Sequence, residues 1–331
     1  MNYCDKYISI SAYCIGLGQE DRQKMKNRDF KSSILLFLAA FIWGVAFVAQ
    51  SVGMDYVGPM TFNGSRFLLG GTVLLPFIYY RKKTGQEKKA EDPKEAGALR
   101  KMTLTGGICC GLAICISSCL QQYGIQYTTV GKAGFITALY IVIVPILGIF
   151  LGKKAGLLVW AGALLAIVGF YLLCITESFR INQGDMLVFL CAISFSFHIL
   201  IIDHFAPKVD GVKLSCIQFY VSGILCTLAA FILEKPTWSG LVAGAAPILY
   251  AGIFSCGVAY TLQILGQARV QPTVASMILS LESVISVLAG WVILKETLTG
   301  RQLVGCILVF LAIILAQLPW PPKKSGEEAC R

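Results

Sequence analysis

The sequence ILLFLAAFIWGVAFVAQSVG, residues 34–53, contains no charged side chain. About 20 mostly apolar residues in a helix cross the hydrocarbon core of a bilayer, which is ~30 Å thick, because an α-helix rises 1.5 Å per residue. This stretch therefore predicts a membrane-spanning helix.

Comparable apolar stretches follow along most of the chain. The composition agrees, since 56% of the residues are hydrophobic and only 14% are charged, against roughly a quarter charged in soluble domains. The sequence therefore predicts an all-α membrane protein with ten transmembrane helices. The predicted spans are 34–53, 60–80, 103–125, 131–151, 155–174, 185–203, 213–233, 241–265, 273–293 and 300–318.

The second half of the chain weakly repeats the first. A shift of 152 residues aligns Trp43 with Phe195, and a shift of 142 residues aligns Tyr140 with Glu282. Because each copy would hold five helices, an odd number, the second copy must insert with the opposite orientation. We expect two inverted five-helix repeats, 33–174 and 175–318, between cytoplasmic tails 1–32 and 319–331. A substrate site usually lies near the midplane between such halves.

The distribution of lysine and arginine predicts the orientation, because basic residues of short loops stay in the cytoplasm. With the N-terminus inside, most of the basic residues lie on the cytoplasmic side, and both termini are then cytoplasmic. The opposite side holds only Lys132, Arg180, Lys235, Lys295 and Arg301. The net charge of +10 then faces the anionic inner leaflet, so it does not indicate nucleic acid as a partner. The expected location is the plasma or inner membrane.

Three segments outside the spans carry further expectations. Residues 1–30 do not form a signal peptide, because charges interrupt any apolar core, and Met25 has the character of a translation start. The loop 81–102, rich in Lys, Glu and Gly, is expected to be a flexible cytoplasmic connection. Lys153-Lys154 is expected to be cytoplasmic.

The chain has thirteen cysteines, most of them within predicted spans. They are expected to be reduced. Cys109, Cys110, Cys115 and Cys119 on one helix raise the question of a metal, but zinc requires thiolates that converge tetrahedrally. Free cysteine is also a good packing residue, so we expect no metal site.

Several motifs identify a family resemblance. Helix 1 contains Ala39-Ala40-Phe41-Ile42-Trp43-Gly44, and helix 2 contains Gly64-Ser65-Arg66-Phe67-Leu68-Leu69-Gly70. Near the C-terminus, Ser280-Leu281-Glu282-Ser283-Val284 precedes Leu294-Lys295-Glu296-Thr297-Leu298-Thr299 and Gln302-Leu303-Val304-Gly305. The chain thus resembles EamA-like proteins of the drug/metabolite transporter superfamily over about 34–318. It departs from them at Ser283, where the family often has proline, and at Lys153-Lys154, where an acidic residue is usual.

The resemblance implies a secondary transporter, often an exporter of amino acids or related metabolites, and no cofactor. It does not imply one substrate. An enzyme would need a reactive constellation on facing helices, and none is visible in the sequence. A scaffold or lipid-handling protein without solute transport remains the alternative, although it gives Glu282 no role. The sequence leaves open whether the protein forms a homodimer.

Arg66 and Glu282 are charged residues well inside predicted spans, where a charge costs about 2.5–3.5 kcal/mol on insertion scales. Glu282 lies about ten residues into its predicted span, and it could bind a substrate amine, carry a proton or serve helix packing. Arg66 lies about 9 Å from the external end of helix 2, at 1.5 Å of rise per residue. It could pair with a substrate carboxylate, reach the outer surface or bind a helix-end carbonyl.

Other polar and aromatic side chains on predicted spans complete the candidate substrate site. His198 is one turn from Ser194, and a lone membrane histidine is more often hydrogen-bonded than a ligand. The full set of predicted substrate-binding residues is Trp43, Phe47, Gln50, Arg66, Gln122, Tyr140, His198, Tyr260, Gln263 and Glu282.

Overall fold

The computed structural model describes residues 19–84, 93–150, 157–174, 182–268, 270, 275 and 278–317. The described residues form helices and connecting turns, with no strand among them. Residues 1–18 of the predicted N-terminal tail, the C-terminal tail 319–331 and the pair Lys153-Lys154 lie outside the described residues.

The first half of the described chain contains six helices. They are α2 (Gln19–Gly53), α3 (Pro59–Lys83), α4 (Pro93–Ile125), α5 (Val130–Thr137), α6 (Tyr140–Phe150) and α7 (Leu157–Cys174). The second half contains α8 (Gln183–Phe205), α9 (Gly211–Leu233), α10 (Trp238–Ala243), α11 (Ala245–Leu249), the π-helix η1 (Tyr250–Tyr260), α12 (Thr261–Gln267), α14 (Leu281–Leu294) and α15 (Gly300–Gln317).

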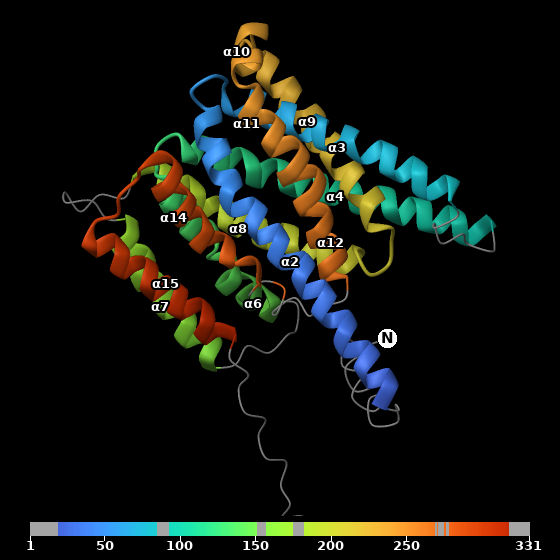
Figure 1. The fold of residues 1–331 in the computed structure, drawn as a ribbon, viewed down its shortest axis with the longest axis horizontal. Helices are drawn as coiled ribbons and strands as arrows, with labels where there is room; N and C mark the ends of the chain where they lie inside the picture. Colours follow the sequence, from blue (N-terminus) through green and yellow to red (C-terminus); the bar gives the residue numbers. More distant parts are fainter. Residues whose placement is uncertain are drawn as a thin grey trace, which may run out of the picture.

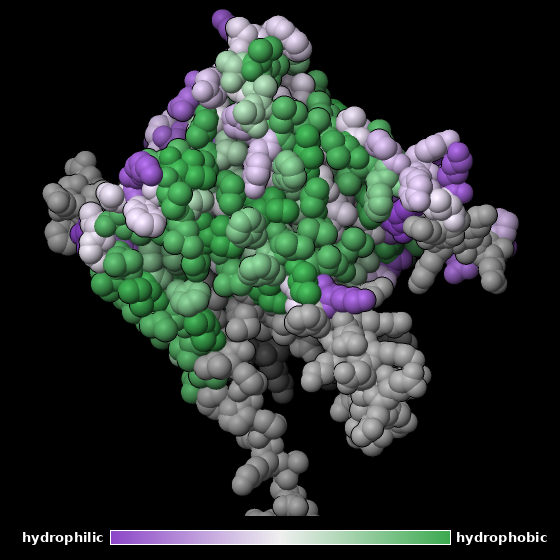
Figure 2. Space-filling view, viewed as in Figure 1, coloured by the Kyte–Doolittle hydropathy of each residue, from purple (hydrophilic) through white to green (hydrophobic). Residues whose placement is uncertain are grey.

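Six helical segments are long and apolar enough to cross a membrane: Lys31–Gly53, Pro93–Ile125, Val130–Gly148, Gln183–Phe205, Gly211–Leu233 and Ala245–Gln267. Shorter apolar helices cover Trp160–Gly169, Leu281–Leu294 and Gly300–Ala312. Figure 2 shows a broad hydrophobic face over α2, α12, α14 and α15. Large side chains on the outside are apolar too, with Ile232 81% and Phe231 69% exposed. The structure confirms an all-helical chain with several membrane-spanning helices.

Two predicted spans are not continuous helices. The fourth, 131–151, is divided at Ala138 and Leu139 into α5 and α6. There the backbone makes tight i→i+3 bonds, from Leu139 N to Ile136 O and from Ile141 N to Ala138 O. Pro145 lies inside α6, and its missing N–H removes the bond that the Ile141 carbonyl would accept. In the ninth predicted span, 273–293, a turn at Ser280 precedes the helix α14, which begins at Leu281.

Within the predicted flexible connection 81–102, residues 81–83 and 93–102 are helical, and residues 85–92 lie outside the described residues. α3 continues to Lys83, and α4 already begins at Pro93. Proline is favourable in the first helical turn, and the Lys, Glu and Ala residues that follow it are good helix formers. The membrane boundary therefore does not end these helices, because their sequence supports a helix in water as well.

The helices pack in pairs that join distant parts of the chain. The most extensive pairs are α7 with α15, α3 with α9 and α4 with α8. α7 and α15 lie together at one edge of the bundle (Figure 1). Between α4 and α8 the backbones nearly touch, since a Cβ on Gly184 would lie 2.6 Å from the Gly124 carbonyl oxygen. Such close approach suits a membrane bundle, in which small residues let helices associate.

Two glutamates stabilise the start of helices far away in the sequence. Glu234 follows α9 and accepts bonds from the backbone N–H groups of Met60 (2.7 Å) and Thr61 (2.8 Å) at the start of α3. Glu296 follows α14 and accepts from Val130 N (2.9 Å) and Gly131 N (3.2 Å) at the start of α5. A carboxylate is favourable at a helix N-terminus, where the first N–H groups lack helical partners.

A buried ion pair joins α5 to α8. Lys132 Nζ donates to Asp185 Oδ2, and Thr128 Oγ1 donates to Asp185 Oδ1. The two charged side chains are only 8% and 0% exposed. A pair this buried depends on both partners, because removal of one leaves an uncompensated charge.

We expect Lys132→Met to cost about 3–5 kcal/mol of stability, because Asp185 would remain charged and buried without its partner. The measurement is thermal unfolding of the purified protein in detergent. The double variant Lys132→Met/Asp185→Asn should recover much of the loss. As a control, Arg81→Met breaks the Arg81–Asp210 pair (3.1 Å), whose side chains are each 23% exposed, and should cost at most about 1 kcal/mol. Equal losses in Lys132→Met and Arg81→Met would contradict the prediction.

Candidate functional site

A pocket lies inside the bundle between α2, α3, α4, α5, α6, α8, η1, α12 and α14. Helices from both halves of the sequence therefore contribute to it. The pocket is lined by Trp43, Phe47, Gln50, Arg66, Gln121, Thr137, Tyr140, Phe195, His198, Ile199, Ser255, Tyr260, Gln263 and Glu282.

All of the residues predicted from the sequence line this pocket except Gln122. The Gln122 side chain instead donates from Nε2 to the Gln50 carbonyl oxygen at 2.9 Å. Its neighbour Gln121 lines the pocket and donates from Nε2 to Thr137 Oγ1 at 3.2 Å. Gln122 thus connects α4 to α2, and Gln121 connects α4 to α5 within the pocket wall.

Arg66 is a buried cation in the pocket wall. It is 3% exposed, so it does not reach the outer surface. Its guanidinium carbon lies 4.9 Å from the centre of the Phe67 ring and 5.6 Å from that of Phe62, where the ring faces attract a cation. Its Nε has no hydrogen-bond partner.

Glu282 is the acidic group of the pocket. It is 4% exposed, and its Oε1 has no hydrogen-bond partner. The sequence predicted Glu282 in the middle of a continuous helix. In the structure it lies in the first turn of α14. A turn at Ser280 comes just before α14, so the carboxylate lies near a helix N-terminus, a favourable place for negative charge.

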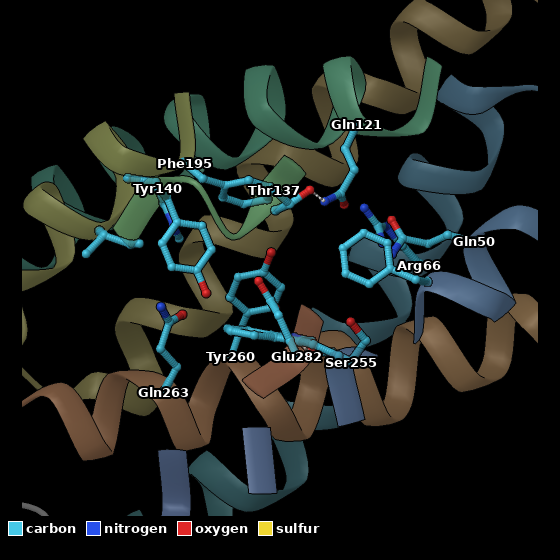
Figure 3. A pocket seen from close by; sticks show the side chains of 14 residues that line it. Gln50, Arg66, Gln121, Thr137, Tyr140, Phe195, Ser255, Tyr260, Gln263 and Glu282 are labelled. Carbon is cyan, nitrogen blue, oxygen red and sulfur yellow. Dashed lines mark hydrogen bonds between the residues drawn. The ribbon is translucent and has the colours of Figure 1, made fainter. Parts of the chain in front are cut away.

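The charged groups are separated within the pocket. In Figure 3, Glu282 and Tyr260 point into its middle, with Tyr140 on one side and Arg66 and Gln50 on the other. Within the described part of the chain no ion pair joins Arg66 to Glu282. A basic and an acidic side chain therefore face one pocket without an ion pair between them.

Aromatic rings form a continuous wall beside these charges. Tyr260 contacts Trp43 edge to face, with ring centres 4.6 Å apart, and also lies 6.1 Å from His198 and 5.7 Å from Phe219. His198 pairs its Nε2 with Gln218 Oε1 at 3.1 Å. His198 is thus hydrogen-bonded, as a lone membrane histidine usually is, while its ring also faces the pocket.

The π-helix η1 gives the pocket a backbone acceptor. Trp43 Nε1 donates to the Ser255 carbonyl oxygen at 3.3 Å, across from α2 to η1. A π-helix widens the turn and departs from the regular α-helical bonding pattern, and such segments often occur at functional sites. The predicted span 241–265 gave no sign of this change.

Five lining residues do not belong to the predicted set: Gln121, Thr137, Phe195, Ile199 and Ser255. For Phe195 a signal existed, because the shift of 152 residues aligns it with Trp43, and both rings line the pocket. Thr137 lies three residues before Tyr140, on the other side of the helix break. Nothing in the sequence distinguishes Ser255 from the other small residues of its span.

Comparison with known proteins identifies related transporters. The model of the EamA-like transporter family matches twice, at residues 30–175 and 182–318. An uncharacterized transporter of Archaeoglobus fulgidus is 32% identical over 288 residues, which cover 86% of this chain and 84% of that protein. The uncharacterized inner membrane transporter YedA of Escherichia coli K12 is 23% identical, with 86% and 89% covered. One solved crystal structure has the same fold, with a TM-score of 0.63 at 19% identity, and 86% of this chain and 96% of that chain are covered.

A cysteine placed in the pocket should be open to a water-soluble reagent. Ser255 is itself buried but lines the pocket, so we expect Ser255→Cys to react with a charged methanethiosulfonate reagent when the pocket opens, because thiolate reactivity needs access to water. Labelling of the peptide is measured by mass spectrometry of membranes. Ser222→Cys is the matched control, because Ser222 is fully buried and donates to the Gly111 carbonyl oxygen at 2.7 Å outside the pocket. Equal labelling of the two variants would mean that the pocket is not a hydrated cavity.

Proposed function

Because the chain belongs to the EamA-like transporter family of the drug/metabolite transporter superfamily, we propose that it is a secondary-active carrier that exports a small polar or amphiphilic metabolite, such as an amino acid. The pocket between the two halves would bind the substrate, and alternating access would carry it across the membrane. The protein itself is a membrane transporter by its family.

The observation that carries the proposal is the pair of opposite charges in one pocket. Arg66 Nε and Glu282 Oε1 are both buried and unpartnered. An unpaired buried polar group is costly, so a ligand that binds both groups stabilises the pocket. A zwitterion does this, with its carboxylate on Arg66 and its ammonium on Glu282. The aromatic wall of Trp43 and Tyr260 would contact the apolar part of the same ligand.

An inverted repeat of two five-helix units supports alternating access. The two matches of the family model, 30–175 and 182–318, parallel the proposed repeats 33–174 and 175–318. The aligned pairs Trp43/Phe195 and Tyr140/Glu282 all line the pocket. A site at the interface of two such repeats becomes accessible from each side as one repeat moves against the other. Ten transmembrane helices with both termini in the cytoplasm follow from this arrangement and from the positions of lysine and arginine.

The ends of the bundle carry polar contacts that can serve as gates. The ion pair between Lys132 and Asp185 joins α5 to α8, and the pair between Arg81 and Asp210 joins the end of α3 to the start of α9. In the proposed topology these two pairs lie at opposite faces of the membrane. Opening of one end would break one pair, and opening of the other end would break the second.

We propose that Glu282 also carries the coupling proton. In proteoliposomes loaded with mixed labelled amino acids and related metabolites, we expect a pH gradient to drive transport by the wild type. Glu282→Gln keeps the shape of the side chain but cannot exchange a proton, so gradient-driven transport should be lost. Glu95→Gln, on the exposed start of α4, is the matched control and should transport normally.

Gradient-driven transport at the wild-type rate in Glu282→Gln would contradict proton coupling through this residue. Movement of a fluorescent lipid in the same vesicles, with no uptake of any metabolite, would instead favour lipid handling. The proposal requires no second copy of the chain and no cofactor.

Arg66 should determine the requirement for a substrate carboxylate. We expect Arg66→Met to raise KM for the transported metabolite by roughly 10- to 150-fold, since a hydrogen bond to a charged group contributes about 1.5–3 kcal/mol. Arg100→Met, at an exposed position of α4, is the control. A substrate analogue with an amide in place of the carboxylate should bind the wild type weakly and lose nothing further in Arg66→Met. An equal loss for acid and amide would show that Arg66 serves only packing.

A further inference from the structure

A group of three cysteines lies apart from the central pocket. Cys115 and Cys119 come from α4, and Cys226 comes from α9. Their three sulfur atoms all lie within 4.8 Å of one another. From the sequence alone, the cysteines of α4 were expected to serve only helix packing. The tertiary structure adds a thiol from a second helix that faces them.

A thioether lies next to the same group. Cys119 Sγ is 3.4 Å from Met60 Sδ, while Cys226 Sγ lies 3.6 Å from Cys115 Sγ and 3.7 Å from Cys119 Sγ. A metal with bonds to sulfur of about 2.3 Å holds tetrahedral ligand atoms about 3.8 Å apart. The sulfur atoms are therefore already at separations close to those that coordination requires.

We propose that Cys115, Cys119 and Cys226, with Met60, form a binding site for a soft metal ion, and that Cu(I) is the ion that fits best. Soft thiolate and thioether ligands suit Cu(I), Zn²⁺ and iron–sulfur clusters, and the thioether of Met60 favours Cu(I) among these because Zn²⁺ is usually held by Cys, His, Asp and Glu. Each coordinating thiol gives up its proton to solvent, so binding of the ion releases protons and becomes tighter as the pH rises.

The four sulfur atoms line a second pocket, and an amide supports one of them. This pocket, apolar in character, is lined by Met60, Cys115, Cys119, Tyr123, Leu187 and Cys226, among others, and shares no residue with the central pocket. Cys115 and Cys119 are partly exposed. Asn63 Nδ2 lies 4.0 Å from Cys119 Sγ, so it can donate to the thiolate, as outer groups do around metal ligands.

The geometry does not depend on the transport proposal. Arg66 and Glu282 lie in the other pocket, and loss of the cysteines removes no group that lines it. Metal binding and metabolite transport can therefore fail independently of each other.

The experiment is a titration of reduced, purified full-length protein in detergent with Cu(I), under nitrogen and in competition with the chromogenic chelator bicinchoninate. We expect the wild type to remove one equivalent of Cu(I) from the chelator. In Cys226→Ser and in Cys115→Ser/Cys119→Ser, the affinity should fall by more than the 10- to 100-fold typical for loss of an outer-shell partner. X-ray absorption should show sulfur at about 2.3 Å from the metal, the usual metal–thiolate distance.

The matched control is Cys109→Ser/Cys306→Ser, which removes two cysteines outside the group and should bind as the wild type does. Because Cys226 is buried and its replacement can disturb folding, Met60→Leu gives a second test. It keeps the apolar volume, removes only the thioether, and should weaken Cu(I) binding severalfold with unchanged thermal unfolding.

Two results would overturn the inference. One is Cu(I) affinity in Cys226→Ser and Met60→Leu equal to that of the wild type. The other is a thiol count below the thirteen cysteines of the chain in protein denatured without reductant, with Cys226 linked to Cys115 or Cys119 in the peptide map. That result would identify the group as a disulfide pair.

Discussion

The absence of water in the membrane interior is the constraint on which the rest of the structure depends. A helix satisfies its own backbone there, but every helix end and every break exposes N–H and C=O groups that need partners. Glu234 and Glu296 meet this need at the starts of α3 and α5. Each glutamate comes from a turn far away in the sequence and next to a lysine with left-handed backbone, Lys235 (φ 50°) and Lys295 (φ 58°). Hydrogen bonds from unpaired backbone N–H groups to these glutamates thus join distant parts of the chain.

Unpartnered buried polar atoms occur in the pocket and elsewhere in the described bundle, for example in Ser118 and Gln218. Other buried side chains outside the pocket find a partner, as Ser222 does with the Gly111 carbonyl and Ser196 does with the Ala192 carbonyl. Several of the side chains that line the pocket do not, among them Gln50, Arg66, Gln263 and Glu282. In a low dielectric such groups are costly to leave unpaired, and those of the pocket face one cavity, where a single bound ligand could contact several of them. The three cysteines proposed to bind a metal differ from these groups, because a neutral thiol is weakly hydrated and is buried in an apolar pocket at little cost.

Sequence reasoning reached the class of protein, the positions of most helices and most of the lining residues. Arg66 and Glu282 were recognisable because charge inside an apolar span is expensive. The sequence did not predict changes of backbone conformation within stretches of uniform hydropathy. Residues 131–151 are apolar on both sides of the break at Ala138 and Leu139, and the hydropathy of Tyr250–Tyr260 does not distinguish a π-helix from an α-helix. Gln121 and Gln122 are adjacent and chemically identical, so only their rotation about α4 decides which one faces the pocket.

The sequence by itself determined that the chain resides in a membrane and belongs to a transporter family, because hydropathy, charge distribution and motifs are properties of consecutive residues. The tertiary structure decided which side chains meet. Phe195 faces the same pocket as Trp43, Lys132 pairs with Asp185, and Cys226 faces Cys115 and Cys119. These contacts depend on the angles and rotations at which helices pack, and those are set by close approach at small residues such as Gly124 and Gly184. Helix packing of this kind joins residues with no regular spacing along the chain.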